Sequence, residues 1–244
     1  MHNARPHLSM LPSALAAISR ATLVWSLALG VGTIAPASAA EPAIQIPGGS
    51  FPVTLTGSEP TAFTELQNAA GTLKGTGVSV RIEATAARSG TYTATFKAVK
   101  KGAESCNSAG AGAGEVVIPA TNTVKLVYDA LGTELSAGLL FNLAELEVKC
   151  GTTKVFIRGT DLGAVGPINA TAKTAGFMTT LKCSHKSGGE PFDVDYWENT
   201  ETVFKVALLE ANFGTGFKKA CELIETFPSV FLELSASKSV TIAA

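Results

Sequence analysis

The chain has 244 residues, of which 46% are hydrophobic, 16% charged and 7% aromatic, and its formal net charge is −1. This composition excludes a disordered or collagen-like chain, and the near-neutral charge argues against nucleic acid as a partner. A chain of this length can bury a sizeable core within a single domain.

The first 40 residues have the three parts of a secretory signal peptide. A basic start without acidic residues precedes an apolar run at residues 21–34, and small residues follow, including the cleavage motif Ala37-Ser-Ala39. We expect cleavage after Ala39 or Ala40, which leaves residues 41–244 as a single secreted domain at or outside the cell envelope. An uncleaved membrane anchor is the alternative, but the apolar run is shorter than the roughly 20 residues of a spanning helix. No transmembrane segment is expected after cleavage.

The cysteines of the mature chain indicate disulfide bonds. An even number in an exported chain predicts two disulfides with three possible pairings. We favour Cys106 with Cys150 and Cys183 with Cys221, each closing a loop of about 40 residues, and the other two pairings remain open. Zinc is the competing interpretation, but Cys-x-x-Cys is absent and Cys183-Ser-His185 offers a single close pair of ligand types. We therefore expect no metal and no other cofactor.

Segments in which apolar and polar residues alternate follow one another along the mature chain. Residues 78–85 and 92–98 alternate with period two on either side of Ser89-Gly90, which predicts a hairpin with one buried face. Further strands are predicted at residues 124–128, 144–150, 154–158, 177–181, 203–209, 230–234 and 240–242. The prediction is an all-β fold, an antiparallel β-sandwich or jelly-roll-like architecture stabilised by disulfides.

Four segments are harder to interpret. Residues 62–70 fit a short helix that ends at Gly71, and residues 217–225 fit helix and strand equally, so at most one or two short helices are expected. Residues 159–176 are rich in Gly, Ala and Thr and are interpreted as a long loop between strands. The glycine-rich residues 108–115 lack the lysine and spacing of a phosphate-binding loop and are interpreted as a flexible connector.

The stretch 188–199 contains the candidate binding residues. Tyr196 and Trp197 form a candidate aromatic platform for sugars or partner residues, although both are equally compatible with the core. Asp193, Asp195 and Glu198 offer hard oxygen ligands for calcium, or a carboxylate pair for glycoside hydrolysis. A solvated acidic loop is the simpler interpretation, because the spacing matches no EF-hand loop.

Catalytic patterns are weak. His185 is the only histidine beyond the predicted cleavage site, and neither G-x-S-x-G nor H-E-x-x-H occurs. We therefore expect no enzyme but a secreted structural or binding protein, with cell-wall polysaccharide or another surface protein as candidate partners. A secreted polysaccharide hydrolase that uses Asp193, Asp195 or Glu198 is the alternative function. A calcium-stabilised extracellular module is the second alternative.

Several ordered landmarks carry a family resemblance. They are Cys106-Asn-Ser-Ala-Gly-Ala-Gly-Ala-Gly-Glu-Val116, Leu126-Val-Tyr128, Glu147-Val-Lys-Cys-Gly151 and Val155-Phe-Ile-Arg-Gly159. Over residues 62–183 the chain resembles a paralogous family of uncharacterised secreted proteins from high-GC Gram-positive bacteria. That family often has further cysteines near the positions of Glu83 and Val99, which this chain lacks. If those two pair with each other, the resemblance implies a Cys106–Cys150 pair, together with secretion, β-architecture and no assigned activity.

Overall fold

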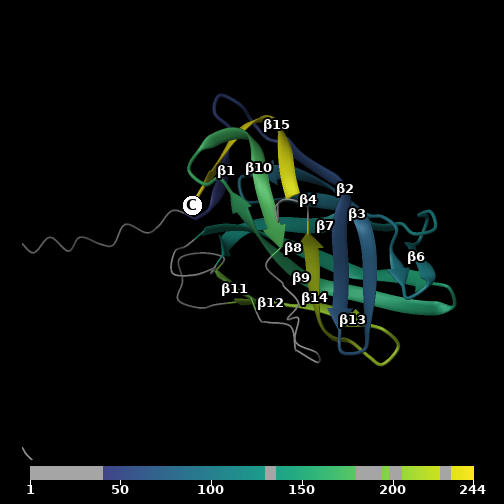
Figure 1. The fold of residues 1–244 in the computed structure, drawn as a ribbon. Helices are drawn as coiled ribbons and strands as arrows, with labels where there is room; N and C mark the ends of the chain where they lie inside the picture. Colours follow the sequence, from purple (N-terminus) through teal and green to yellow (C-terminus); the bar gives the residue numbers. More distant parts are fainter. Residues whose placement is uncertain (1–40, 130–135, 180–193, 198–204, 226–231) are drawn as a thin grey trace, which may run out of the picture. The chain divides into compact units, whose positions relative to one another are not determined.

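The protein forms one continuous antiparallel sheet. The computed structural model (Figure 1) describes residues 41–129, 136–179, 194–197, 205–225 and 232–244, all of them within one compact unit, Ser38–Ala244. Within these residues there are strands and turns but no helix. The strands are β1 (Ala43–Gln45), β2 (Val53–Asn68), β3 (Gly71–Ala86), β4 (Ser89–Phe96), β5 (Lys100–Lys101), β6 (Glu104–Ser108), β7 (Val116–Asp129), β8 (Ser136–Cys150), β9 (Thr153–Gly166), β10 (Thr171–Thr179), β11 (Val194–Trp197), β12 (Lys205–Ala207), β13 (Leu209–Asn212), β14 (Lys218–Glu225) and β15 (Leu232–Ala243).

The predicted all-β, antiparallel and disulfide-stabilised class is confirmed. The predicted hairpin is β3–β4, but its turn lies two residues earlier than expected, at Ala87 and Arg88. Gly90 belongs to β4, where a Cβ atom would collide with the carbonyl oxygen of Glu83 on the neighbouring strand. The glycine is therefore needed for close approach of two strands rather than for the turn itself.

Two other sequence interpretations are wrong. Residues 62–68 are the second half of β2 and pair with β3 and β14, so ladder pairing overrides the local helical pattern. Residues 159–166 continue β9 and pair with β8, and β10 begins at Thr171, so the expected long loop shrinks to residues 167–170. The ambiguous residues 218–225 are strand β14. Glycine and alanine have low intrinsic strand propensity, and this made residues 159–166 look like a loop. The neighbouring strands nevertheless pair with this segment and hold it in the sheet.

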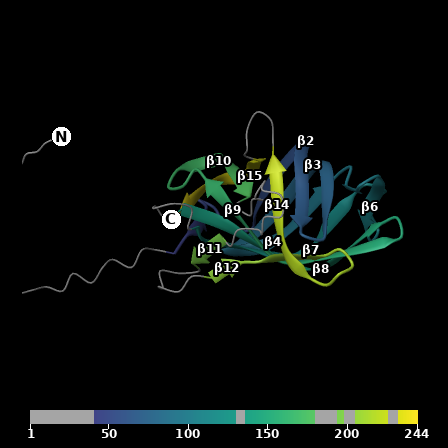
Figure 2. The same cartoon turned by 60° about the horizontal axis from the view of Figure 1, so that its bottom comes forward.

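The strand ladders close into two rings that share four long strands, β2, β3, β8 and β9. We call the first ring the circuit β2–β3–β4–β7–β8–β9–β10–β15, which returns from β15 to β2. The second ring is the circuit β2–β3–β5–β6–β8–β9–β13–β14, which returns from β14 to β2. Figure 2 shows β14 beside β2, where the second ring closes.

Each long strand changes rings along its length. In β2, residues 53–59 pair within the first ring and residues 63–68 within the second, and the register with β3 shifts between Glu59 and Phe63. In β8, a register shift between Leu143 and Leu146 separates the two parts in the same way. Such irregularities bend and twist a strand. Four strands can therefore belong to two rings in succession.

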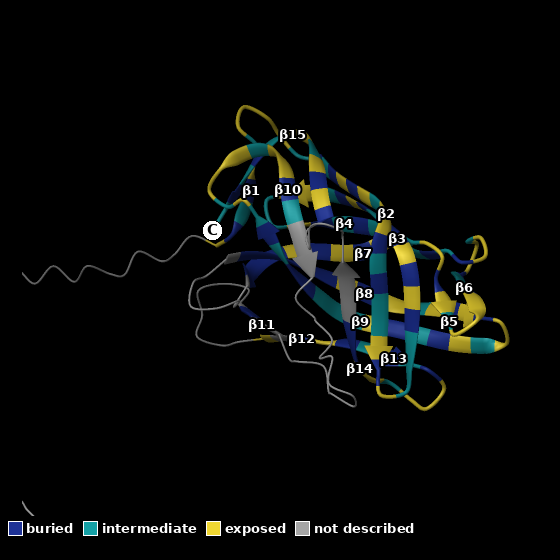
Figure 3. Cartoon of the chain, in the orientation of Figure 1, coloured by how far each residue is buried: buried dark blue, intermediate teal, exposed yellow. Residues whose placement is uncertain are grey.

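Alternation along the strands separates an inner from an outer face (Figure 3). Most buried residues form one cluster on the inner faces. Within the first ring, Tyr92 and Phe141 pack edge to face with ring centroids 4.8 Å apart, and both are almost fully buried. Aromatic pairs in this arrangement add stability beyond the area that they bury. They occupy the interior together with neighbours such as Ile82 and Leu126.

The predicted disulfide Cys106–Cys150 is present and joins β6 to β8 in the second ring. The two cysteines are also direct ladder partners. Cys221 on β14 is disulfide-bonded as well. Its predicted partner, Cys183, lies outside the described residues, so that second pairing stays a prediction.

Residues 1–40, which include the predicted signal peptide, also lie outside the described residues. The fold includes the residues directly after the predicted cleavage sites, because Glu41 forms an ion pair with Arg88 and Pro42 is fully buried. Among the described residues, the structure contains no helix with the length and apolarity that crossing a membrane requires.

Candidate functional site

The acidic candidates are only partly within the described residues. Asp193 and Glu198 lie outside them, as does His185. Asp195 lies on β11 and pairs with Val206 in the ladder with β12, but its side chain is not among those described. The calcium and hydrolase alternatives therefore stay hypotheses that the described geometry does not address.

The aromatic pair separates into a buried tyrosine and a tryptophan known by its backbone alone. Tyr196 is 6% exposed and belongs to a small apolar cluster. The other members of this cluster are Val127, Leu140, Leu162 and Ala207, contributed by β7, β8, β9 and β12. Trp197 pairs with Tyr128 in the ladder between β11 and β7, and its side chain is not described. The burial of Tyr196 fits the core role that the sequence left open for it.

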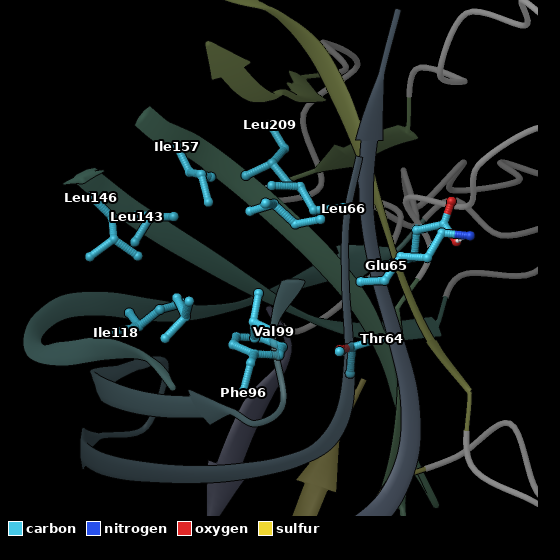
Figure 4. A pocket seen from close by; sticks show the side chains of 14 residues that line it. Thr64, Glu65, Leu66, Phe96, Val99, Ile118, Leu143, Leu146, Ile157 and Leu209 are labelled. Carbon is cyan, nitrogen blue, oxygen red and sulfur yellow. Dashed lines mark ion pairs between the residues drawn. The ribbon is translucent and has the colours of Figure 1, made fainter. Parts of the chain in front are cut away.

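An apolar cavity is lined mainly by strands of the second ring, and Phe96, Val116 and Ile118 of the first ring complete its wall. Its volume is about 70 Å³. Figure 4 shows its wall, formed by residues of β2, β3, β4, β7, β8, β9 and β13 and by Val99, which lies between β4 and β5. Aliphatic groups dominate this wall and include Leu66, Ile118, Leu143, Leu146, Ile157 and Leu209. Phe96 and Val99 line it as well.

The bulge in β8 shapes this cavity. Leu143 and Leu146 both line it although they are three positions apart, a spacing that would send them to opposite faces of a regular strand. The register shift between them restores the same face. The buried Asn122 stabilises the bulge, because its Oδ1 accepts a hydrogen bond from the backbone amide of Ala144 at 2.7 Å. Its Nδ2 donates to the carbonyl oxygen of Pro119 at 2.8 Å, so both ends of this amide are paired.

The charged residues beside the cavity point away from it. Glu65 and Lys74 form an ion pair of 3.3 Å across β2 and β3, and Lys74 is largely exposed. Figure 4 shows the Glu65 side chain directed away from the cavity interior. Alternation explains this, because Glu65 and Lys74 each lie one position from the inward-pointing residues of their strands. The ion pair therefore belongs to the outer face of the ring.

Thr64 supplies a hydroxyl group to the wall. The residue is 5% exposed and lines the cavity from β2. Within the described residues, its hydroxyl has no hydrogen-bond partner. The hydroxyl oxygen is not among the fully buried unpaired atoms of the described residues, so a ligand or a water molecule in the cavity can reach it. The site can thus hold an apolar group and donate or accept one hydrogen bond.

The outer face carries a second, different hollow. It lies over β2, β3 and β4 and is lined by hydroxyl-bearing residues and one cation, namely Thr56, Ser58, Ser79, Arg81, Thr93 and Thr95. These side chains are on the solvent side of the first ring, where strand alternation places polar residues in any antiparallel sheet with one buried face. The cavity is the more specific feature, because its wall is mainly apolar.

Sequence reasoning missed the cavity for a physical reason. Its wall draws on residues from Thr64 to Leu209, and nothing local in the chain indicates that these meet. A period-two pattern at Thr64 and Leu66 and at Leu73 and Gly75 was readable in the sequence. That pattern would have predicted two inward-facing strands, but not the ring that they help to close.

Within the described ranges, no three His, Cys, Asp or Glu side chains lie together as a metal site. Comparison of the chain with models of protein families, with curated proteins and with solved structures finds no match.

Proposed function

We propose that the chain is a secreted, non-catalytic binding protein that acts at or outside the cell envelope and binds its ligand in the cavity of the second ring. One observation carries the proposal: a cavity with a mainly apolar wall, lined largely by strands of the second ring, whose closure includes the Cys106–Cys150 disulfide. Ligand sites in proteins are typically concave and apolar with few polar groups. An eight-stranded closed sheet leaves just enough interior for side chains or one small ligand.

Secretion is supported by the signal-peptide pattern and by the disulfide. Disulfides persist in oxidising compartments and are rare in reducing ones. The buried Pro42 and the paired Glu41 support it further, because cleavage after Ala39 or Ala40 leaves both residues in the domain. The proposal therefore concerns the chain from Glu41 onward.

Binding is supported by the chemistry of the wall. Aliphatic side chains stabilise a ligand by removing its apolar surface from water. The Thr64 hydroxyl adds one polar contact that can orient it. A wall of this composition favours binding of a mainly apolar molecule.

Co-sedimentation tests the proposal. The mature protein, residues 41–244, is incubated with isolated cell envelopes and with insoluble polysaccharides, and soluble sugar is measured in the same tubes. We expect the protein to pellet with envelopes without releasing sugar. Sugar release would replace the proposal by a hydrolase, for which Asp193, Asp195 and Glu198 are the residues to substitute. Absence of pelleting would contradict binding at the envelope.

A matched pair of variants links the binding to the cavity. Ile118 lines the cavity, and its neighbour Val117 points to the opposite face of β7. Ile118→Phe fills the space with a larger side chain, whereas Val117→Phe adds the same ring outside. We expect Ile118→Phe to weaken pelleting and Val117→Phe to leave it unchanged. Equal pelleting of both variants would place the binding elsewhere on the protein.

A further inference from the structure

The wall of the cavity selects for an uncharged group. Most of its lining is aliphatic, with Phe96 and the Thr64 hydroxyl beside it. Two charged residues, Glu65 and Lys74, also border the cavity, but their charged groups pair with each other on the outer face. Transfer of an ion into such surroundings without a partner is strongly unfavourable. Any charged part of a ligand must therefore remain outside, in water.

The dimensions of the cavity select for a narrow group. A site for one water molecule needs about 10–15 Å³, so a volume of about 70 Å³ holds roughly five groups of that size. The wall includes two successive inward positions on β2, Thr64 and Leu66, and two on β7, Val116 and Ile118. Two residues along a strand span about 7 Å. The space is long enough for several methylene groups, and a fused ring system is too large for it.

Part of the wall is left uncovered by the protein itself. Leu66, Phe96 and Leu146 are only partly buried although they line the cavity. Interior residues away from the cavity, such as Ile82 and Leu126, are almost fully buried. Apolar surface that the fold leaves uncovered inside a ring is stabilised when a ligand covers it. The uncovered side chains therefore mark the surface that a bound chain would bury.

We infer that the group bound in this cavity is the end of an unbranched aliphatic chain, inserted methyl end first, with any polar or charged head group left in solvent. The inference rests on the proposed function and names the chemical class of its ligand. Chains of this kind occur in membrane lipids and as free fatty acids, and the shared feature that the cavity recognises is the hydrocarbon end.

A series of straight-chain alcohols from 1-butanol to 1-octanol tests the inference by titration calorimetry on the mature protein. Each buried methylene strengthens binding about fourfold, so we expect the affinity to rise at this rate and then level off once the cavity is full. Cyclohexanol should bind at least tenfold more weakly than 1-hexanol. A flat series, or tighter binding of cyclohexanol, would overturn the inference.

The cavity variants make the result specific. We expect Ile118→Phe to weaken 1-hexanol binding at least tenfold and Val117→Phe to leave it within twofold of the wild type. If Ile118→Phe does not fold, as judged by circular dichroism, Leu146→Phe replaces it with Glu145→Phe as its exposed control. Equal binding by the cavity variant and its control would show that the alcohols bind elsewhere and would refute the inference.

The two proposals fail in distinguishable ways. Envelope pelleting that persists while the alcohol series stays flat would refute the aliphatic ligand and leave the secreted binding protein standing. Loss of both pelleting and alcohol binding would refute both. Binding to phosphatidylglycerol vesicles and to free decanoate is compared, in order to distinguish membrane lipids from free fatty acids as the source of the aliphatic group. Binding to either one supports the inference and identifies the source. Binding to neither contradicts it.

Discussion

The two rings use the same four long strands but differ in what holds them closed. In the first ring, the remaining strands are β4, β7, β10 and β15, which contain 8 to 14 residues each. In the second ring, closure from β3 to β8 depends on β5 with 2 residues and β6 with 5 residues. The disulfide lies at this short connection, between Cys106 of β6 and Cys150 of β8.

The interiors of the two rings differ as well, and the ring with the shorter closing strands is the less completely filled. The first ring contains the Tyr92–Phe141 aromatic pair, whereas the cavity is lined mainly by strands of the second ring. Close packing over long ladders gives the first ring its own stability. The second ring leaves apolar surface uncovered and compensates with a covalent bond. The comparison suggests that one part of the molecule stabilises the fold while the other keeps space for a ligand.

Removal of the disulfide should have the largest effect. The bond spans 44 residues, and on the chain-entropy model a loop of that size stabilises by about 4 kcal/mol. We expect the double variant Cys106→Ser, Cys150→Ser to lose about that much stability in urea unfolding. Hydrogen exchange should show the amides of β6 losing protection before those of β4. Loss of protection in both strands at the same rate would contradict the division into two rings.

Truncation of a leucine should cost more in the first ring than in the second. Leu126 is 2% exposed in the filled interior, and Leu126→Ala should cost about 3 kcal/mol. Leu146 already faces the cavity and is partly exposed, so it has fewer packing partners to lose. Leu146→Ala should cost about half as much. Equal losses in urea unfolding would show that the two interiors are equally well packed.

The strand content was largely predictable because it depends on local alternation. The expected strands at residues 124–128, 144–150 and 154–158 lie within β7, β8 and β9. Cys150 is in phase with the apolar residues Leu146 and Val148 of the predicted strand, and it is fully buried. Residues 159–166 were misread because the strand propensity of glycine says nothing about a ladder whose partners lie elsewhere in the chain.

The candidate site was not predictable from the sequence. The alternation of residues 143–146 breaks at the bulge, and the reason for the break is Asn122, a residue on a different strand. Ring closure places Thr64 opposite residues that are distant in the chain. The bulge and the ring closure both depend on tertiary contacts. The alternation of apolar and polar residues along one strand predicts neither of them. The residues predicted instead, Tyr196 and Trp197, were chosen for side-chain chemistry without knowledge of their burial.

A smaller effect is expected at the cavity wall itself. Thr64→Val replaces the hydroxyl by a methyl group of similar shape, and no hydrogen bond within the described residues is lost. Because the added methyl group packs against an apolar wall, we expect a gain of about 1 kcal/mol in unfolding free energy. Thr93→Val on the outer face of β4 is the control and should change stability by less than about 0.5 kcal/mol. Destabilisation by Thr64→Val alone would indicate that the hydroxyl has a partner, such as a bound water molecule.

The smallest effect concerns alkaline pH and the inner face of the first ring. Burial raises the pKa of Tyr128 above its ordinary value of 10.0; the nearby Glu41 also raises this pKa, while Arg88 lowers it. Above pH 10 the unfolded chain releases the phenol proton while the folded chain retains it, so stability should fall as the pH rises past that value. The variant Tyr128→Phe lacks this proton, and its unfolding free energy should decline less steeply as the pH rises above 10. A parallel decline in both proteins would mean that this phenol ionises as freely in the folded state as in the unfolded chain. The contrast between a closely packed first ring and a second ring that borders a cavity would then lose one of its supports.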